Sequence, residues 1–334
     1  MYNHCYIIII EVINLFFKVP DTVKEAGVIE RKSLTKKILE FIGIIFLGSI
    51  LQEVFINIVQ IIMLLVNGKI KDIEFVLKTL LDPSLMDEPV LILFLYSTIL
   101  GIVVAIYHCV KREKRPITSM GFRKMGMFKE YGKGLLLGFI LISLVVGIEV
   151  LTGALKITGL GNLSFVSILL LIVFMIGFFI QSAEEEIMLR GYFLTSLSVN
   201  NSIPVAIIVS SFGFGLLHIF NDGFGIISLI NISLIGVFLA LYYIQTNNIW
   251  GVAAIHGIWN FAQGNIYGIQ VSGMNITRTV FVSKAIEGKE LLNGGSFGAE
   301  AGIVSTIVYL LFIVGILIYM YKKGTILKKE RINA

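Results

Sequence analysis

Long apolar runs constrain this chain more than any other feature of its sequence. Runs of about 18 or more apolar residues recur along it, and a helix of that length can cross the hydrocarbon core of a bilayer. Of the 334 residues, 15% are charged and 56% are hydrophobic. Soluble domains carry about 25% charged residues, and the strands of a membrane β-barrel would alternate and be about half as long. The sequence therefore predicts an all-α integral membrane protein.

The apolar runs predict about eight transmembrane helices that form one bundle, with no internal repeat and no domain boundary within it. The predicted spans cover about residues 38–66, 90–110, 134–155, a fourth from 163, then 203–220, 224–245, 249–267 and 299–321. The predicted domains are an N-terminal leader and cytoplasmic segment (1–37), a membrane domain (38–321) and a basic cytoplasmic tail (322–334).

Basic residues flank the apolar runs and predict the orientation of the chain. The densest group, Lys111-Arg112-Glu113-Lys114-Arg115, follows the second span, while Lys36-Lys37 and Lys322-Lys323 lie at the first and last spans. Because Lys and Arg accumulate in cytoplasmic loops, both termini are predicted to be cytoplasmic, and the loop at residues 68–88 external. This pattern accounts for the net charge of +5, so we expect a multi-pass protein of the cell membrane and no nucleic-acid partner.

The stretch Ser182-Ala183-Glu184-Glu185-Glu186-Ile187-Met188-Leu189-Arg190-Gly191 places three carboxylates and a guanidinium directly after an apolar run. A charge near the bilayer centre costs at least about 2.5–3.5 kcal/mol, so intramembrane ionisable groups indicate a function. The alternative is that the helix reaches the cytoplasmic surface at Glu184 and its charges are solvated there. Glu186 and Arg190 are one helical turn apart and can neutralise one another, whereas Glu185 points about 100° away.

Two histidines in later spans can lie at a depth similar to that of these glutamates. If spans four and five turn near Asn200-Asn201, Glu185 lies about 15 residues before the turn and His218 about 17 after it, so both are on the order of 22–26 Å from it. His256 and Asn260 share one face of the seventh span because they are one turn apart. The sequence therefore predicts an intramembrane polar cavity between these spans.

These residue types suit the hydrolysis of an amide inside a membrane. A buried carboxylate beside an imidazole can polarise a water molecule, and a second His with an Asn offers donors to a developing oxyanion. The same residue types could instead hold zinc, with Glu185, His218 and His256 as ligands and an open fourth position. The residue types alone leave both alternatives open.

Three motifs, in order on successive predicted spans, resemble those of the CPBP family of intramembrane proteases. They are Glu185-Glu186-x-x-x-Arg190-Gly191, Phe214-x-x-x-His218 and His256-x-x-x-Asn260. This family includes the CAAX prenyl endopeptidases and bacterial bacteriocin-processing or immunity proteins. The resemblance covers about residues 111–263 and includes the basic stretch from Arg115 to Phe122.

The resemblance implies an eight-helix endopeptidase whose substrate is a membrane-embedded or lipid-modified peptide or protein. The implied site residues are Glu185 and His218 as activators of water, His256 and Asn260 as the oxyanion site, and Glu186, Arg190 and Phe214 in support. It favours a glutamate-dependent mechanism without a catalytic metal. Maturation, toxin immunity and membrane-protein turnover are all compatible with this activity.

Two other classes of membrane protein are also compatible with the sequence. Transporters and proton-coupled channels use intramembrane Glu and His to relay protons, although no paired halves with broken helices are visible. A non-catalytic immunity or scaffold protein could retain the fold and the motifs.

The sequence also leads to predictions for four residues outside the motifs. Glu53, near the middle of the first span, is expected to face the bundle interior or a wet cavity. Glu149, near the outer end of the third span, is expected to be interfacial. Cys5 and Cys109 are too few for a disulfide framework and are expected to be structural.

Overall fold

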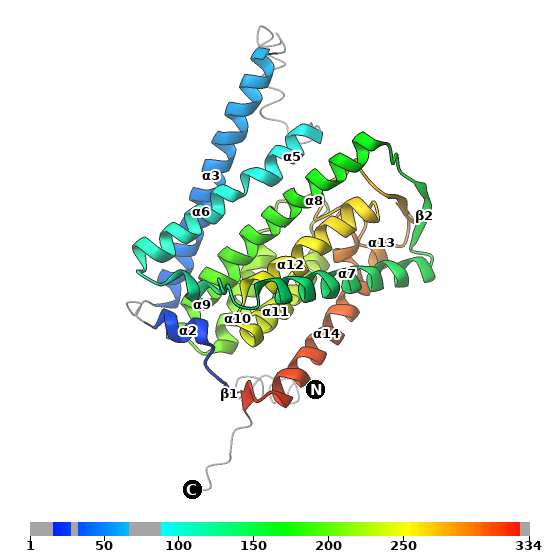
Figure 1. Ribbon diagram of the computed structural model, residues 1–334. Coiled ribbons are helices and arrows are strands. Elements are labelled where there is room, and N and C mark those ends of the chain that lie inside the picture. The colour runs from blue at the N-terminus through cyan, green and yellow to red at the C-terminus, as the bar shows by residue number, and fades with distance from the viewer. Residues whose placement is uncertain (1–15, 28–32, 67–87, 328–334) are drawn as a thin grey trace.

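A computed structural model describes residues 16–27, 33–66 and 88–327 of the chain (Figure 1). Most of the predicted leader, most of the predicted external loop and the end of the basic tail lie outside the described residues. Within them the chain is mainly helical, with little β-structure, which confirms the predicted all-α fold.

Six helical segments of the described chain are long and apolar enough to cross a membrane. They are α3 (Leu34–Val66), the run of α5 (Glu88–Ser97), α6 (Ile99–Tyr107) and η2 (His108–Arg112), α7 (Met127–Leu151), the run of α8 (Phe165–Glu186), η4 (Ile187–Leu194) and α9 (Thr195–Asn200), α11 (Ile226–Thr246) and α14 (Ile303–Lys322). The protein is therefore a multi-pass membrane protein.

Two further apolar helices are shorter than a full span. They are α10 (Ile203–Leu216), with 14 residues, and α12 (Ile249–Phe261), with 13 residues, which continues into the π-helical η5 (Ala262–Ile266). They correspond to the fifth and seventh predicted spans. The total of eight spans and the predicted orientation of the termini stay predictions.

Local sequence signals mark several helix ends. The Ser164 side chain accepts a hydrogen bond from the Ser167 amide at the start of α8. The chain turns between α11 and α12 at Asn247, whose φ is 51°, and the Asn248 side chain then caps α12. Asn tolerates the left-handed conformation better than most residues and is a favoured N-cap. These two residues therefore hold α11 and α12 as neighbours.

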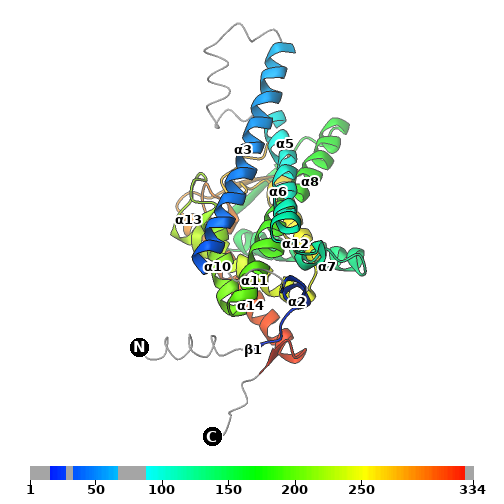
Figure 2. The ribbon, with the colours of Figure 1, turned by 90° about the vertical axis from the view of Figure 1, so that its left-hand side faces the viewer.

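The helices form one bundle in which α12 packs against both α7 and α8 (Figure 1). On α7, a Cβ added to Gly134 or Gly138 would collide with the backbone of α12, so the small residues permit this close approach. Helix α10 packs on α11, and α11 packs on α14. Figure 2 shows α3 at the edge of the bundle, beside α6 and extending beyond its neighbours.

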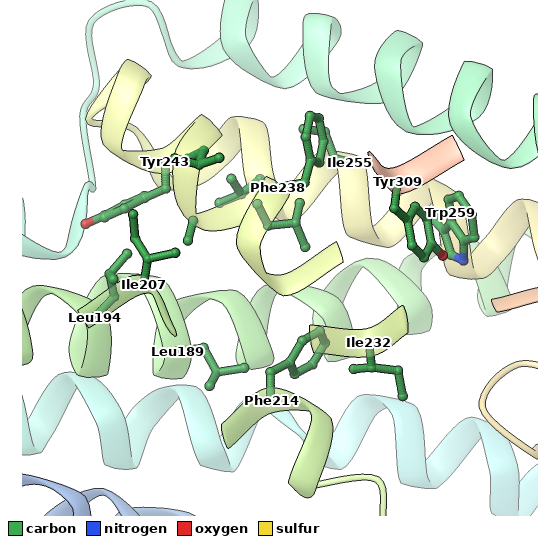
Figure 3. Close-up of a cluster of buried hydrophobic side chains, with 14 of the residues drawn as sticks. Leu189, Leu194, Ile207, Phe214, Ile232, Phe238, Tyr243, Ile255, Trp259 and Tyr309 are labelled. Atoms are coloured by element: carbon green, nitrogen blue, oxygen red, sulfur yellow. The ribbon is translucent and has the colours of Figure 1, made fainter. Parts of the chain in front are cut away.

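The buried core lies where these helices meet. Figure 3 shows its aliphatic and aromatic side chains, including Leu189 near Phe214 and the paired rings of Trp259 and Tyr309, whose centroids are 5.5 Å apart. Most of the exposed side chains on α3 are instead apolar, as expected for a helix that faces lipid. The packed core therefore centres on α8, α10, α11 and α12.

We call the end of the bundle at which α7 and α12 begin and α11 and α14 end the basic end. A small antiparallel sheet lies there, formed by β1 (Phe16–Phe17) and β4 (Ile326–Leu327). The same end carries the short helices α2 (Asp21–Ala26) and η3 (Ile117–Met120).

The opposite end carries a second antiparallel sheet, formed by β2 (Leu155–Leu160) and β3 (Phe281–Ala285). The sequence did not indicate either strand, because β2 follows the third span directly. Two short helices, α13 (Glu290–Asn293) and η6 (Ala299–Ala301), complete this end.

The expectation that Glu149 is interfacial is wrong. Its side chain is fully buried in α7, and neither carboxylate oxygen has a hydrogen-bond partner among the described residues. The loop after α12 folds back over this end of α7, where the Asn293 side chain donates to the carbonyl of Ala154. This cover comes from residues far along the chain, so the position of Glu149 within its own span could not reveal it.

A buried ion-pair network holds α3 at the basic end. Lys37 of α3 and Arg115 both bind Glu113, with 2.9 Å between Arg115 Nη1 and Glu113 Oε2. Ser196 and Tyr192 also donate hydrogen bonds to this carboxylate. The sequence assigned these basic residues to membrane orientation alone, but Lys37 and Arg115 are only 1% exposed.

Two opposing effects in this network, burial and nearby positive charge, determine the pKa of Glu113. Burial of the carboxyl group opposes its ionisation, but the neighbouring Arg115 and Lys37 outweigh burial and hold its pKa below the ordinary value. Glu113 is therefore ionised at neutral pH and neutralised by two cations.

Candidate active site

A cavity of about 680 Å³ lies between α3, α8, α10, α11 and α12. Glu185, His218, His256 and Asn260 all line it, although they come from three separate parts of the chain. Apolar side chains complete the wall, among them Phe214, Ile232, Ile255 and Trp259. The structure thus brings the four residues that the sequence singled out for chemistry into one cavity.

The three consecutive glutamates occupy the last turn of α8, immediately before the π-helical segment η4. Successive residues of a helix point about 100° apart. As a result Glu184 lies between the cavity and α3, Glu185 lies in the cavity wall beside α12, and Glu186 faces the interior of the bundle. One short stretch therefore supplies carboxylates to three different surroundings.

Glu186 is fully buried and fixes His256. Its Oε1 accepts a hydrogen bond from Arg190 Nη1 at 2.9 Å and another from His256 Nδ1 at 2.9 Å. Arg190 also donates to the carbonyl of Gly236 at 3.2 Å, and its guanidinium lies 4.8 Å from the ring centre of Phe214. With Nδ1 bound to Glu186, the other ring nitrogen of His256 faces Glu185.

Glu185 is held by one oxygen only. Its Oε1 accepts a hydrogen bond from Gln181 Nε2 at 2.7 Å, four residues earlier on α8. Its Oε2 lies 3.6 Å from His256 Nε2, which is too long for a hydrogen bond, and has no hydrogen-bond partner in the described part of the chain. The side chain is 23% exposed and lines the cavity, whereas Oε2 itself is buried.

His218 lies in the turn that follows α10, because that helix ends at Leu216 rather than continuing to residue 220 as the predicted span did. Its Nδ1 is 2.9 Å from the carbonyl oxygen of Phe214. A carbonyl can only accept, so Nδ1 donates and Nε2 carries the lone pair in the neutral ring. The Phe214 ring lies between the two histidines, with ring centroids 5.1 Å from His218 and 5.8 Å from His256.

Asn260 is engaged within the protein. Its Nδ2 donates to Gln181 Oε1 at 3.1 Å and to Ser182 Oγ at 3.3 Å. Because Gln181 in turn donates to Glu185, these side chains form a chain of hydrogen bonds from α12 to the cavity carboxylate. Asn260 therefore positions Gln181 in this structure, and its role as an oxyanion donor stays a prediction.

Sequence reasoning assigned no role in the site to Glu184. Its Oε1 accepts a hydrogen bond from Gln52 Nε2 of α3 at 2.8 Å. The carboxylate fills the space that a side chain at Gly101 of α6 would need. Gln52 was the available signal, because a polar residue near the middle of an apolar span needs a partner. Glu53, also expected to face a cavity, lines this one.

Glu300 of η6 was missed as well. Its Oε1 accepts hydrogen bonds from the Ser272 amide at 2.5 Å and the Ser272 hydroxyl at 2.6 Å. Asn221 Nδ2 donates to the carbonyl of Ser272 at 2.9 Å, three residues beyond His218. Glu300 thus fixes one wall of the cavity beside His218. No local pattern in the sequence joins residues so far apart.

The described residues contain no group of three or more His, Cys, Asp or Glu side chains arranged to hold a metal ion. This includes the alternative zinc ligands Glu185, His218 and His256. The three side chains therefore do not form a ready metal site in this structure, and the choice between a zinc-dependent and a metal-free mechanism stays a prediction.

Residues 165–262 match the family described as type II CAAX prenyl endopeptidase Rce1-like. The matched segment runs from α8 through α12 and contains all three motifs that line the cavity. No curated protein and no solved structure matches the chain. Over this segment, the chain is similar to the Rce1-like family of CAAX prenyl endopeptidases.

Proposed function

We propose that this protein is an intramembrane endopeptidase in which Glu185 and His218 activate the water that hydrolyses a peptide bond. The observation that carries the proposal is Glu185, which lines a cavity shared with His218, His256 and Asn260 and whose Oε2 has no hydrogen-bond partner among the described residues. Buried polar atoms normally have partners, so an unsatisfied carboxylate oxygen in a cavity indicates a binding position for water or substrate. The family match supports a protease, and the residue roles are our assignment.

In the proposed reaction, water donates a hydrogen bond to Glu185 Oε2 and lies within reach of His218 Nε2. Glu185 takes one proton while the water oxygen attacks the carbonyl carbon of the scissile bond. The carbonyl oxygen becomes an oxyanion as the new C–O bond forms. The C–N bond then breaks, the proton held by Glu185 passes to the leaving amine, and the carboxylate is restored.

His256 is the proposed donor to the oxyanion. Its Nδ1 bonds to Glu186 at 2.9 Å and its Nε2 lies on the Glu185 side. A histidine between two carboxylates can carry a proton on each nitrogen, and Nε2–H would then donate to the oxyanion. Arg190 and Glu186 fix the ring, so this donor needs no reorganisation during the reaction.

The cavity wall indicates the class of substrate. Apolar residues of α3 and α5, including Ile45, Ile56, Leu91 and Phe94, face the same cavity as the polar site. Such a wall suits an apolar transmembrane segment or a lipid-modified peptide and would not retain a polar soluble peptide. We therefore propose a membrane-embedded or lipidated substrate.

Cleavage of lipidated and transmembrane peptides by the purified full-length protein in detergent tests this proposal. We expect Glu185→Gln and His218→Ala to abolish cleavage, and Glu287→Gln, in an exposed loop, to retain it. Unchanged turnover in Glu185→Gln would contradict the assignment. Chelator treatment addresses the metal, because a lasting loss of activity that only zinc restores would contradict the metal-free mechanism.

A further inference from the structure

A second cavity, of about 1630 Å³, lies at the basic end. It shares no lining residue with the candidate active site. Its volume exceeds the range of about 300–1,000 Å³ that is usual for small-molecule pockets. The apolar and aromatic part of its lining includes Leu137 of α7, Phe238 and Tyr242 of α11, Trp250 of α12, and Phe312 and Ile316 of α14. We call this cavity the basic-end groove.

The groove exists because α7 and α14 diverge toward the basic end (Figure 1). Gly315 of α14 lines it, and a Cβ added there would meet nothing within 4 Å. The two helices are therefore not packed together at this level. A long apolar surface consequently faces the groove from both sides.

Four basic residues form the rim: Arg123, Lys124, Lys129 and Lys133. Two of them are already neutralised, because Arg123 pairs with Glu25 at 2.7 Å and Lys133 pairs with Glu130 at 2.6 Å. Lys124 and Lys129 are exposed and form no ion pair within the described residues. Asp21 also lines the groove, and it pairs with Lys24 at 2.9 Å. The rim therefore offers two uncompensated positive charges, Lys124 and Lys129, beside an apolar interior.

Exposed apolar residues place this rim at the membrane surface. Met125 is 93% exposed and Phe128 is 84% exposed, and both lie between the two unpaired lysines in the sequence. Large apolar side chains beside lysines are typical of segments that lie at the boundary between headgroups and acyl chains. Lys124 and Lys129 would then reach the level of the phosphates, because lysine extends its ammonium toward the headgroups.

We infer that the basic-end groove binds an anionic phospholipid, with its headgroup phosphate at Lys124 and Lys129 and an acyl chain along Leu137, Phe312 and Ile316. The choice of an anionic phospholipid depends on both parts of the groove, the basic rim and the apolar interior. A free phosphate ion would satisfy the lysines and leave the apolar interior unfilled. A zwitterionic lipid would fill the interior and bring a second cation to the rim. Basic pockets between transmembrane helices are known to bind anionic headgroups.

Lipid titration of the purified full-length protein, followed by native mass spectrometry, tests the charged half of the site. The probes are phosphatidylglycerol and phosphatidylcholine with identical acyl chains. We expect tighter binding of phosphatidylglycerol and, in K124Q/K129Q, a loss on the order of tenfold or more. The matched control K111Q/R112Q removes two exposed positive charges at the same end, outside the groove, and should bind like the wild type.

Filling the groove tests the apolar half. Gly315→Trp should remove the bound phosphatidylglycerol without disturbing helix packing, because nothing lies near that position. Gly147→Trp on α7 is the control, since its Cβ would also meet open space but Gly147 does not line the groove.

Three results would overturn the inference. One is equal binding of the two lipids by the wild type. The second is binding of phosphatidylglycerol by Gly315→Trp that matches the Gly147→Trp control. The third is displacement of phosphatidylglycerol by equimolar inorganic phosphate, which would mean that the rim binds a free anion.

Discussion

The bundle contains two buried clusters of charged residues that differ in how completely they are satisfied. At the basic end, both oxygens of Glu113 have partners: Lys37 and Tyr192 bind Oε1, and Arg115 and Ser196 bind Oε2. At the candidate active site, Glu185 in the cavity wall and the buried Glu186 behind it each have one oxygen without a hydrogen-bond partner among the described residues.

This difference separates a structural role from a chemical one. An unpaired polar atom in a low-dielectric interior costs free energy, so a stable fold satisfies its buried groups wherever it can. The complete network around Glu113 therefore holds α3 and the segment after η2 in place. The incomplete cluster around Glu185 leaves carboxylate oxygens without partners, and in the proposed function water and substrate would satisfy them.

The largest expected effect is on cleavage by Glu185→Gln. The amide keeps the size of the side chain and can still meet Gln181, but it cannot take a proton from water. General base catalysis is worth about 10²–10⁴-fold, so we expect kcat/KM to fall by about 10³-fold. The thermal midpoint of unfolding in detergent should stay near that of the wild type. A large loss of stability would place Glu185 with the structural network instead.

For Arg115→Met we expect a loss of stability with little loss of activity, the opposite of the result expected for Glu185→Gln. This change leaves a buried carboxylate with only Lys37 as its counter-charge, and breaking a buried pair in this way costs about 3–5 kcal/mol. Denaturant titration in detergent should show this loss, while the activity per folded molecule stays close to that of the wild type.

A double variant provides the control for Arg115→Met. Glu113→Leu combined with Arg115→Met replaces the pair by apolar groups, and such replacements are often neutral or stabilising. It should therefore regain much of the lost stability. If Arg115→Met alone is as stable as the wild type, the network does not hold the fold.

A smaller effect is expected for Gln181→Leu, which removes the only hydrogen bond to Glu185 that the structure shows. Glu185 is still a carboxylate but is no longer held in position by Gln181. A misplacement of about 1 Å can cost on the order of 10²-fold in rate. We expect kcat to fall while KM stays unchanged, because Gln181 acts through Glu185 rather than on the substrate. A rise in KM alone would assign Gln181 to substrate binding.

Sequence patterns predicted the structural features that depend on the spacing of residues close together in the chain. The length of the apolar runs predicted the long helices, and the four-residue spacing predicted the pair of Glu186 with Arg190 that the structure contains. The order of the three motifs predicted that Glu185, His218 and His256 would share a cavity, which the structure contains.

Contacts between distant parts of the chain were not predictable in this way. Gln52 and Glu184 are 132 residues apart, and Ser272 and Glu300 belong to a loop and a short helix without periodicity. The burial of Glu149 and of Lys37 depends on how distant segments cover them. Neither hydropathy nor helical spacing contains this information.

Acid pH should weaken the basic-end network, and this is the smallest expected effect because one group is responsible. Arg115 and Lys37 hold the pKa of Glu113 below its ordinary value of 4.5, against the opposing effect of burial. The folded protein therefore binds fewer protons than the unfolded chain near that pH. The resulting stabilisation is complete above the pKa of the unfolded chain and is lost as the pH falls through the lower pKa of the folded state.

Glu113→Gln separates this effect from the general response to acid, because glutamine does not titrate. The fall in the free energy of unfolding from pH 7 to pH 4 should be smaller in Glu113→Gln than in the wild type. The exposed-loop variant Glu287→Gln should respond to pH like the wild type. Identical pH dependence in all three proteins would show that Glu113 is not held ionised by its neighbours. The contrast between the fully hydrogen-bonded network around Glu113 and the incompletely bonded cluster around Glu185 would then not depend on the ionised state of Glu113.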